Sequence, residues 1–298
     1  MKVLVTGVNG QLGHDVAEEL RRRGQETVGV DLADMDITDD EAVQRTLLSV
    51  FPDAVVHCAA WTAVDAAEEA ENLETVRRVN VNGTANLAHA CHMLGCKMLY
   101  ISTDYVFDGH GSEPWQADCK AFAPLSVYGQ TKLEGELAVS EVLERYFIVR
   151  ISWVFGINGN NFVKAMLRLG EKQDSLRVVC DQIGTPTYTR DLARLLADML
   201  ETEKYGCYHA TNEGGYISWA DFAREIFHEA GKQVAVIPVT TAEYGASKAK
   251  RPLNSRLDKR KLVANGFRPL PIWQDALKRY LKELEKQNGT NEGNENRD

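Results

Sequence analysis

The sequence predicts an α/β fold in which helices cover both faces of a doubly wound parallel sheet. Two observations lead to this prediction. The first 31 residues have the pattern of a strand, a glycine-rich turn, a helix and a second strand. The chain then continues to alternate apolar strands with helices of about ten residues or more, as far as residue 151. In such a sheet the crossovers are right-handed, and ligands bind outside the carboxyl ends of the strands.

The opening unit has the properties of a dinucleotide-binding turn. Its strand, helix and second strand are expected at Lys2–Thr6, Asp15–Arg23 and Thr27–Val30. Gly7 allows a tight turn, Gly10 allows the backbone to approach phosphates, and Gly13 allows the helix to pack closely on the strand. Three glycines at this spacing are a weak signal alone. The preceding strand, the following helix and Asp31 at the end of the second strand make nucleotide binding the favoured interpretation.

The remaining elements follow in order, and several strands end at polar residues. Up to residue 151 we expect a helix at Asp39–Val50, a strand at Ala54–Cys58, a helical stretch at Asn72–Leu94 interrupted near Asn82-Gly83, a strand at Lys97–Ser102, a helix from Tyr128 to Tyr146 and a strand at Phe147–Ile151. After Phe155 we expect helices at Asn161–Glu171, Thr189–Glu201, Ser218–Ala230 and Pro271–Lys286, with strands at Leu176–Cys180 and Gly206–Thr211.

The second half of the chain is less regular and predicts a smaller lobe interleaved with the last parts of the sheet. We assign residues 1–155 and 190–212 to a dinucleotide-binding domain, and residues 156–189 and 213–287 to a substrate-binding lobe. Residues 288–298 are polar and rich in glycine and asparagine, which predicts a disordered tail.

Composition limits the classes of function. The 298 residues are 44% hydrophobic and 26% charged, as in an ordinary globular protein, and no apolar run reaches the length of a membrane helix. The net charge of −9 argues against a nucleic-acid partner. The six cysteines form no C-x-x-C pair and the chain opens without a signal-peptide pattern, so we expect a cytoplasmic protein with neither a disulfide framework nor a zinc site.

A tyrosine and a lysine form the strongest candidate for catalysis. Tyr128 and Lys132 lie four residues apart on one helical face, and Thr103 follows a strand that ends at the same edge of the sheet. A free tyrosine has a pKa near ~10, and a neighbouring ammonium would lower it. A second pair with this spacing, Tyr244 and Lys248, lies in the irregular lobe and is expected to be a solvated surface.

Six segments resemble one enzyme family. TGVNGQLG (6–13), STDYVFDG (102–109) and YGQTK (128–132) resemble the extended short-chain dehydrogenase/reductases, which have a Rossmann-type fold. CAAWTAVDAAE (58–68), DQIGTPTY (181–188) and RPLNSRLD (251–258) are similar to the dTDP-4-dehydrorhamnose reductase branch of that superfamily. The resemblance implies NAD(P)H-dependent reduction of the C4 ketone of dTDP-4-dehydro-L-rhamnose, with a nucleotide-sugar substrate.

The resemblance also implies roles for individual residues. The catalytic group would be Thr103, Tyr128 and Lys132. The substrate would contact Thr62, Val64, Thr103, Tyr105, Tyr128, Trp153, Asn161 and Arg251, with Arg251 facing the diphosphate. The cofactor-binding residues that we predict are Gly7, Asn9, Gly10, Gln11, Leu12, Asp31, Asp36, Ile37, Ala59, Ala60, Thr62, Tyr128 and Lys132.

Two alternatives to this function remain open at the level of sequence. One is another nucleotide-sugar reductase or epimerase of the same fold. The other is a non-catalytic subunit similar to the regulatory subunit of methionine adenosyltransferase. Some members of the resembled family dimerise through acidic residues that hold magnesium, but this chain has Arg190 at one such position. We therefore predict no metal and treat a homodimer as possible.

Asp31 predicts the preferred cofactor. A carboxylate at the end of the second strand accepts hydrogen bonds from the adenosine ribose hydroxyls and repels a 2′-phosphate. Neither the turn from Val8 to Leu12 nor Leu32 offers a cation, and Arg21–Arg23 lie too far along the first helix. We expect NADH to be preferred, with NADPH still used.

Overall fold

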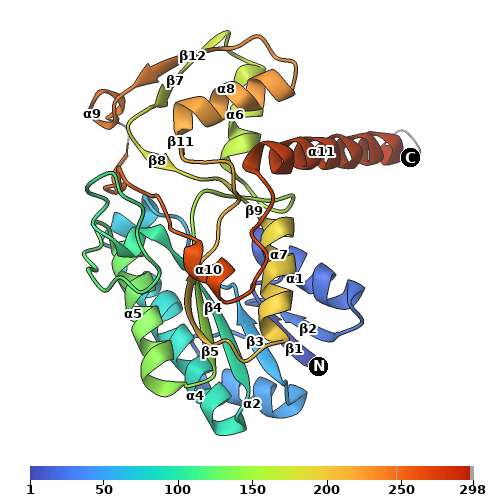
Figure 1. Cartoon of the computed structure of the whole chain (residues 1–298). Helices are drawn as coiled ribbons and strands as arrows, with labels where there is room; N and C mark the ends of the chain where they lie inside the picture. The colour runs from blue at the N-terminus through green and yellow to red at the C-terminus, as the bar shows by residue number, and fades with distance from the viewer. Residues whose placement is uncertain (246, 296–298) are drawn as a thin grey trace.

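The structure is a computed structural model that describes residues 1–245 and 247–295, with backbone alone for residues 288–295. A parallel sheet with helices on both faces forms one part of the molecule, and a smaller lobe lies beyond the carboxyl ends of its strands (Figure 1). The α/β fold predicted from the sequence is confirmed.

The main sheet contains six parallel strands in the order β10-β5-β4-β3-β1-β2. Their bounds are Lys2–Thr6 (β1), Glu26–Val30 (β2), Ala54–His57 (β3), Lys97–Thr103 (β4), Tyr146–Ile151 (β5) and Gly206–His209 (β10). The strand order changes direction between β1 and β3, and parallel sheets of this kind bind ligands in the crevice at that point.

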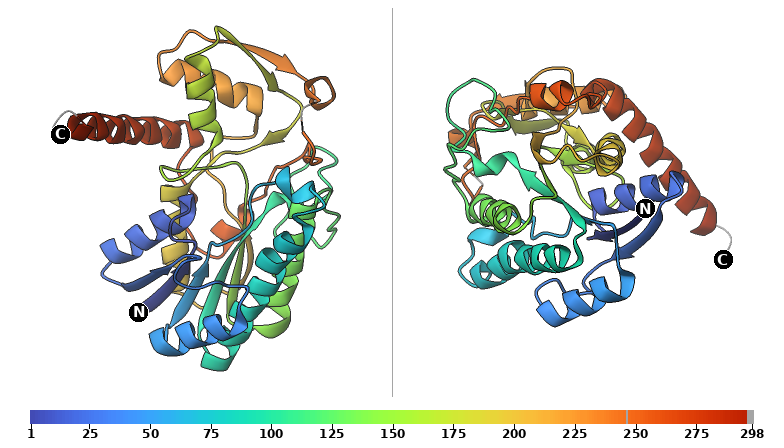
Figure 2. Two further views of the ribbon diagram at one scale, coloured as in Figure 1. Left: turned by 180° about the vertical axis from the view of Figure 1, so that it is seen from behind. Right: turned by 60° about the horizontal axis from the view of Figure 1, so that its bottom comes forward.

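Alternate residues of the strands enter two separate cores, as expected for a sheet covered on both faces. On β1, Val3 and Val5 lie in a core shared with helices α1 (Gln11–Arg22) and α7 (Thr189–Leu200). Leu4 lies in the other core, which includes residues of α2 (Asp40–Val50), α4 (Thr84–Leu94) and α5 (Val127–Val142). The two further views show these helix layers on opposite sides of the sheet (Figure 2).

Helix α1 begins earlier than the sequence predicted, at Gln11 rather than Asp15. Gly10 is its N-cap residue, and Gly13 lies within the first turn. A glycine inside a helix is normally unfavourable. Here Gly13 is needed because a Cβ atom at this position would lie 2.1 Å from the carbonyl oxygen of Gly7.

The helical stretch predicted at residues 72–94 is present, and a π-helical segment takes the place of the break expected near Asn82-Gly83. A short helix, α3 (Leu73–Arg77), leads into a π-helical segment, η2 (Arg78–Gly83), which continues directly into α4. π-helical turns are rare and occur often at functional sites. This turn carries Asn80, which is buried beside the loop that follows β3.

The lobe is assembled from three two-stranded sheets and several helices. The strand pairs are β6 (Val154–Phe155) with β9 (Thr187–Tyr188), β7 (Ser175–Val179) with β12 (Ala235–Val239), and β8 (Ile183–Gly184) with β11 (Ile217–Ser218). Its longer helices are α6 (Phe162–Gly170), α8 (Trp219–Glu229) and α11 (Trp273–Glu295), which share an apolar core that includes Phe155, Phe222 and Tyr280. Its short helices are α9 (Thr241–Tyr244) and α10 (Arg260–Ala264). Two further short helices, η1 (Ala66–Glu68) and η3 (Asp104–Val106), follow β3 and β4 of the main sheet.

The boundary between the domain and the lobe is interwoven. Leu262, Phe267 and Leu270 belong to the range assigned to the lobe, but they pack in the core of the main sheet with α1 and α7. At the junction, Arg279 of α11 donates two hydrogen bonds to the buried carboxylate of Asp191 on α7, at 2.9 and 2.7 Å. The division by residue number stays a prediction.

The C-terminal helix continues past the predicted end at Lys286. Helix α11 extends to Glu295 and projects from the body of the molecule, so most of the expected tail is helical (Figure 1). The reason is that no proline follows Trp273, and each residue added to an existing helix gains one backbone hydrogen bond. Residues 296–298 of the predicted tail lie outside the described residues. No helix in the described part of the chain is long and apolar enough to cross a membrane.

Candidate active site

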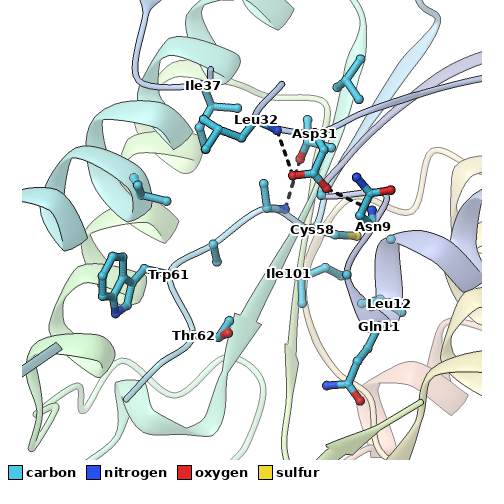
Figure 3. A pocket seen from close by; sticks show the side chains of 18 of the residues that line it. Asn9, Gln11, Leu12, Asp31, Leu32, Ile37, Cys58, Trp61, Thr62 and Ile101 are labelled. Carbon is cyan, nitrogen blue, oxygen red and sulfur yellow. Dashed lines mark hydrogen bonds between the residues drawn. The ribbon is translucent and has the colours of Figure 1, made fainter. Parts of the chain in front are cut away.

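A cavity of about 710 Å³ opens at the carboxyl ends of the strands, where the strand order changes direction. Its walls come from the turn between β1 and α1, the segment after β2, the loop after β3, the end of β4 and the start of α5 (Figure 3). Every residue that we predict to bind the cofactor lines this cavity. The structure therefore brings these residues together, and their roles remain predictions.

The glycine turn has the geometry that a bound pyrophosphate requires. Gly7 has a φ of +67°, which only glycine adopts without strain, and a Cβ atom there would lie 2.8 Å from the amide nitrogen of Ala59. No side chain caps the N-terminus of α1, and its first turn contains no acidic residue. The free amide groups and the helix dipole thus favour an anion at this end of the cavity.

Asp31 directly follows β2, and backbone groups, one of them in the glycine turn, hold its carboxylate (Figure 3). Its carboxylate accepts hydrogen bonds from the backbone N–H groups of Asn9, at 3.0 Å, and Leu32, at 2.9 Å. Asp36 also lines the cavity, and Lys132 is the one lysine or arginine among its described lining residues. Arg22 and Arg23 both pair with Glu19 instead.

Tyr128 and Lys132 both enter this cavity from the first turns of α5. The side chain of Ser126 caps this helix by accepting a hydrogen bond from the N–H of Gly129, which sets where the helix starts. Thr103 is the last residue of β4, and its hydroxyl lies near enough to Tyr128 to act on the phenol. The ammonium of Lys132 lies 4.0 Å from the centre of the Tyr100 ring.

Burial decides the protonation of this pair. It raises the pKa of Tyr128 well above its ordinary value, against the opposing effect of the Thr103 hydroxyl. It lowers the pKa of Lys132 to about 7. The expectation that Lys132 lowers the pKa of Tyr128 is therefore not met in this structure, because desolvation of the phenolate is the larger effect. The phenol of Tyr128 is protonated at neutral pH, as a proton donor must be.

The competing pair in the lobe has a different arrangement. Helix α9 ends at Tyr244, so Tyr244 and Lys248 do not share a helical face. Tyr244 is exposed, and the ammonium of Lys248 pairs with Glu69. The structure thus gives this pair no common environment.

Several buried polar residues that sequence reasoning missed support the site. His57 on β3 lies between the hydroxyl groups of Thr6 and Thr84, at 2.8 and 3.1 Å, and burial lowers its pKa to about 3. The side-chain amide of Asn80 bonds to the backbone of Trp61. No local pattern in the sequence indicates these contacts, since the partners lie far apart along the chain.

Asp104, next to Thr103, is also buried. Its Oδ1 atom accepts a hydrogen bond from Thr103 at 3.1 Å, whereas its Oδ2 atom has no partner among the described residues. Burial raises the pKa of this carboxyl to about 6.

The predicted substrate residues lie around a second hollow as well as the first. Arg251 lines a neighbouring cavity of about 400 Å³ at the lobe, and donates two hydrogen bonds to Asp65 at 3.1 and 2.7 Å. The ring of Tyr105 meets that of Tyr128 edge to face at 5.6 Å. Trp153 has a strained φ of +51° and stacks on Trp219 at 3.7 Å.

The other three predicted substrate residues have different surroundings. Thr62 is exposed at the first cavity, and Val64 is partly buried in the same loop. Asn161 has a structural task, because its side chain caps α6 and its amide donates to Gln11 Oε1 at 3.1 Å. A substrate contact of Asn161 stays a prediction.

One group of residues has the composition of a metal site. His14, Asp15 and Glu18 on α1 bring potential ligand atoms within 4.8 Å of one another. The guanidinium of Arg190 contacts Glu18 at 3.5 Å and pairs with Glu283. A fixed positive charge at this position opposes a cation, which is the charge argument for predicting no metal.

Comparison with known proteins identifies the family. The RmlD substrate binding domain family matches residues 1–286. The chain belongs to this family, the dTDP-4-dehydrorhamnose reductases. It is 43% identical over 280 residues to a dTDP-4-dehydrorhamnose reductase of Streptomyces griseus, covering 92% of this chain and 91% of the relative. It is 40% identical to the spore coat polysaccharide biosynthesis protein SpsK of Bacillus subtilis, covering 95% of this chain and 97% of that protein.

A solved structure in the family has the same fold. The dTDP-4-dehydrorhamnose reductase of Bacillus anthracis, solved in complex with NADP, superimposes with a TM-score of 0.90 at 41% identity, covering 95% of this chain and 99% of that one. The chain is thus an oxidoreductase of the reductase family, as its resemblance implied.

Replacing Tyr128 tests the proton donor. We expect Tyr128→Phe to lower kcat by ~10²-fold or more while the fold and cofactor affinity stay close to wild type, because only the hydroxyl is removed. Steady-state kinetics and fluorescence titration with cofactor measure the two effects. Tyr146→Phe is the matched control and should leave kcat unchanged, because Tyr146 lies at the amino end of β5 and lines neither the main cavity nor the hollow at the lobe. A folded Tyr128→Phe protein with wild-type kcat would remove Tyr128 from the mechanism.

Replacing Lys132 tests the charge next to Tyr128. The ammonium is lost as the pH rises through about 7, so cofactor affinity in the wild type should fall with a midpoint near that pH. In Lys132→Met, affinity should fall at least ~10-fold at pH 6 and this midpoint should disappear. Titration with NADH between pH 5.5 and 9 measures both. An unchanged affinity and an unchanged midpoint would show that Lys132 has neither role.

Proposed function

We propose that this protein reduces the C4 ketone of dTDP-4-dehydro-L-rhamnose to give dTDP-L-rhamnose, with NADH or NADPH as the reductant. The observation that carries the proposal is the position of Tyr128 and Lys132, which line the same cavity as the glycine turn. Membership of the reductase family supplies the substrate.

The residues of the chain divide the reaction between them. When bound, the reduced nicotinamide supplies the hydride for C4. Tyr128 gives its proton to the C4 oxygen, and its high pKa means that the proton is present at neutral pH. Thr103, whose hydroxyl lies near the phenol of Tyr128, orients the phenol toward that oxygen. Lys132 holds the nicotinamide ribose with its ammonium.

The sugar nucleotide is proposed to extend from this cavity toward the lobe. Its diphosphate carries negative charge, and an arginine fork suits such a group. The guanidinium group of Arg251 already donates two hydrogen bonds to a carboxylate, that of Asp65. Arg177 lines the same hollow and adds a second positive charge.

Product analysis tests the reaction. Incubation with dTDP-4-dehydro-L-rhamnose and each reduced cofactor should yield dTDP-L-rhamnose, detected by chromatography and mass spectrometry with equivalent oxidation of the cofactor. Epimerised dTDP-sugar without net oxidation of cofactor would identify an epimerase. A protein that binds cofactor but converts no nucleotide sugar would support the non-catalytic alternative, although Thr103, Tyr128 and Lys132 are all present and assembled.

We also propose that NADH is preferred, with NADPH still used. The charges that line the described cavity support this preference, since Asp31 and Asp36 are carboxylates and the one cation, Lys132, comes from α5. A 2′-phosphate beside Asp31 would meet like charge with no arginine among the described lining residues to neutralise it. A cytoplasmic location and a homodimer remain proposals; the six free cysteines fit a reducing compartment.

The ratio of kcat/KM for the two cofactors tests the role of Asp31. We expect the wild type to favour NADH by ~1–3 kcal/mol, and Asp31→Ala to lose most of this preference because the carboxylate is removed. Asp34→Ala is the control, because Asp34 lies in the same turn outside the cavity lining and its carboxylate accepts one hydrogen bond among the described residues, from the backbone N–H of Asp31. A wild type that favours NADPH, with an unchanged ratio in Asp31→Ala, would refute the assignment.

A further inference from the structure

A buried cluster of charged residues, unused by the reaction above, lies directly behind the catalytic pair. Glu136 on α5 and Arg150 on β5 are each only 3% exposed. Arg150 donates to both carboxylate oxygens of Glu136, from Nε at 2.8 Å and from Nη2 at 2.6 Å. The hydroxyl of Ser102 on β4 donates to the same carboxylate at 2.5 Å. We call Ser102, Glu136 and Arg150 the Glu136 clamp.

The arginine of the clamp is itself fixed in place. Its Nη1 atom donates to the carbonyl oxygen of Ala117 at 3.2 Å. Its guanidinium lies over the rings of Phe107 and Phe122, at 5.1 and 5.0 Å. Because the planar guanidinium group of Arg150 is fixed in this way, its two hydrogen bonds hold the Glu136 carboxylate in a single orientation.

Each member of the clamp is adjacent to a catalytic residue or to a strand that carries one. Ser102 immediately precedes Thr103 on β4. Arg150 is paired with Ser102 in the sheet register. Glu136 lies one helical turn after Lys132 and two turns after Tyr128, on the same face of α5. The clamp therefore joins α5 to β4 and β5, one helical turn along α5 from Lys132 and one residue along β4 from Thr103.

The clamp also contains the negative charge that faces Lys132. The titratable groups around its ammonium are His57 from β3, Cys58 from the loop after it, Tyr100 from β4 and Glu136 from α5, and Tyr128 lines the same cavity. Burial keeps His57 neutral and raises the pKa of Cys58 to about 12. Burial likewise raises the pKa of both tyrosines. Glu136, which is ion-paired with Arg150, is thus the one negative charge among these groups.

We propose that Glu136 is a positioning residue of the active site, which fixes the part of α5 that carries Tyr128 and Lys132 to β4 and β5 through Ser102 and Arg150 and places a negative charge one helical turn from Lys132. Stability of the fold explains this ion pair less well than a role in the active site does, because a buried ion pair can often be exchanged for apolar side chains without loss of stability. The part of this proposal that concerns turnover rests on the proposed function, whereas the part that concerns Lys132 needs only cofactor binding.

Glu136→Gln tests the proposal, because it keeps the size of the side chain and removes the charge. The pH dependence of NADH binding, followed by fluorescence, should keep its form while its midpoint moves about one unit or more below that of the wild type. At pH 7.5, kcat should fall at least ~10-fold with a smaller change in KM for the sugar nucleotide, and should partly recover at lower pH.

Two controls separate charge from packing. Glu136→Asp keeps the carboxylate, so its midpoint should return toward that of the wild type. Ser102→Ala removes one hydrogen bond and no charge, so its midpoint should stay unchanged while kcat falls moderately. If Glu136→Gln does not fold because Arg150 is left unpaired, the double variant Glu136→Leu/Arg150→Met removes both charges of the clamp. Its midpoint should still lie below that of the wild type, by less than in Glu136→Gln because the positive charge of Arg150 is removed as well.

The outcomes distinguish the two proposals. A folded Glu136→Gln or double variant whose midpoint and kcat match the wild type would overturn the role of Glu136. A wild type that binds NADH but reduces no dTDP-4-dehydro sugar would overturn the proposed reaction, while the shift in midpoint would still decide whether Glu136 controls the charge of Lys132.

Discussion

The close approach of three backbone segments at the end of β1 is the constraint on which the site depends. A Cβ atom on Gly13 would lie 2.1 Å from the oxygen of Gly7, and one on Gly7 would lie 2.8 Å from the nitrogen of Ala59. Only glycines allow α1 to start against the strand and the loop after β3 to pass this close. The cavity therefore exists because side chains are absent from one of its walls.

Burial then determines the chemistry of the side chains that do enter the cavity. Taking Tyr128 and Lys132 out of water moves their pKa values in opposite directions, upward for the phenol and downward to about 7 for the ammonium. The phenol is thereby kept as a proton donor. The ammonium becomes sensitive to the few charges nearby, and the buried Glu136 carboxylate supplies the negative one.

The lobe contributes charge and aromatic surface near this cavity. Arg251 reaches back to Asp65 in the loop after β3, and this ion pair, like that of Arg279 with Asp191, connects the lobe to the nucleotide-binding domain. Trp153 stacks on Trp219 of α8 with the rings 14° from parallel. The strained backbone at Trp153 is maintained by this packing.

The sequence by itself determined the order and type of most elements, because periodicity and turn residues are local properties of a chain. It also determined the residues around the glycine turn and the pair Tyr128 and Lys132, since these motifs are defined by the spacing of residues along the chain. The contacts of His57, the π-helical turn at Asn80 and the Glu136 clamp were decided only by the tertiary structure. Their partners come from distant strands and helices, and desolvation, which sets the pKa values of the site, exists only after those elements pack together.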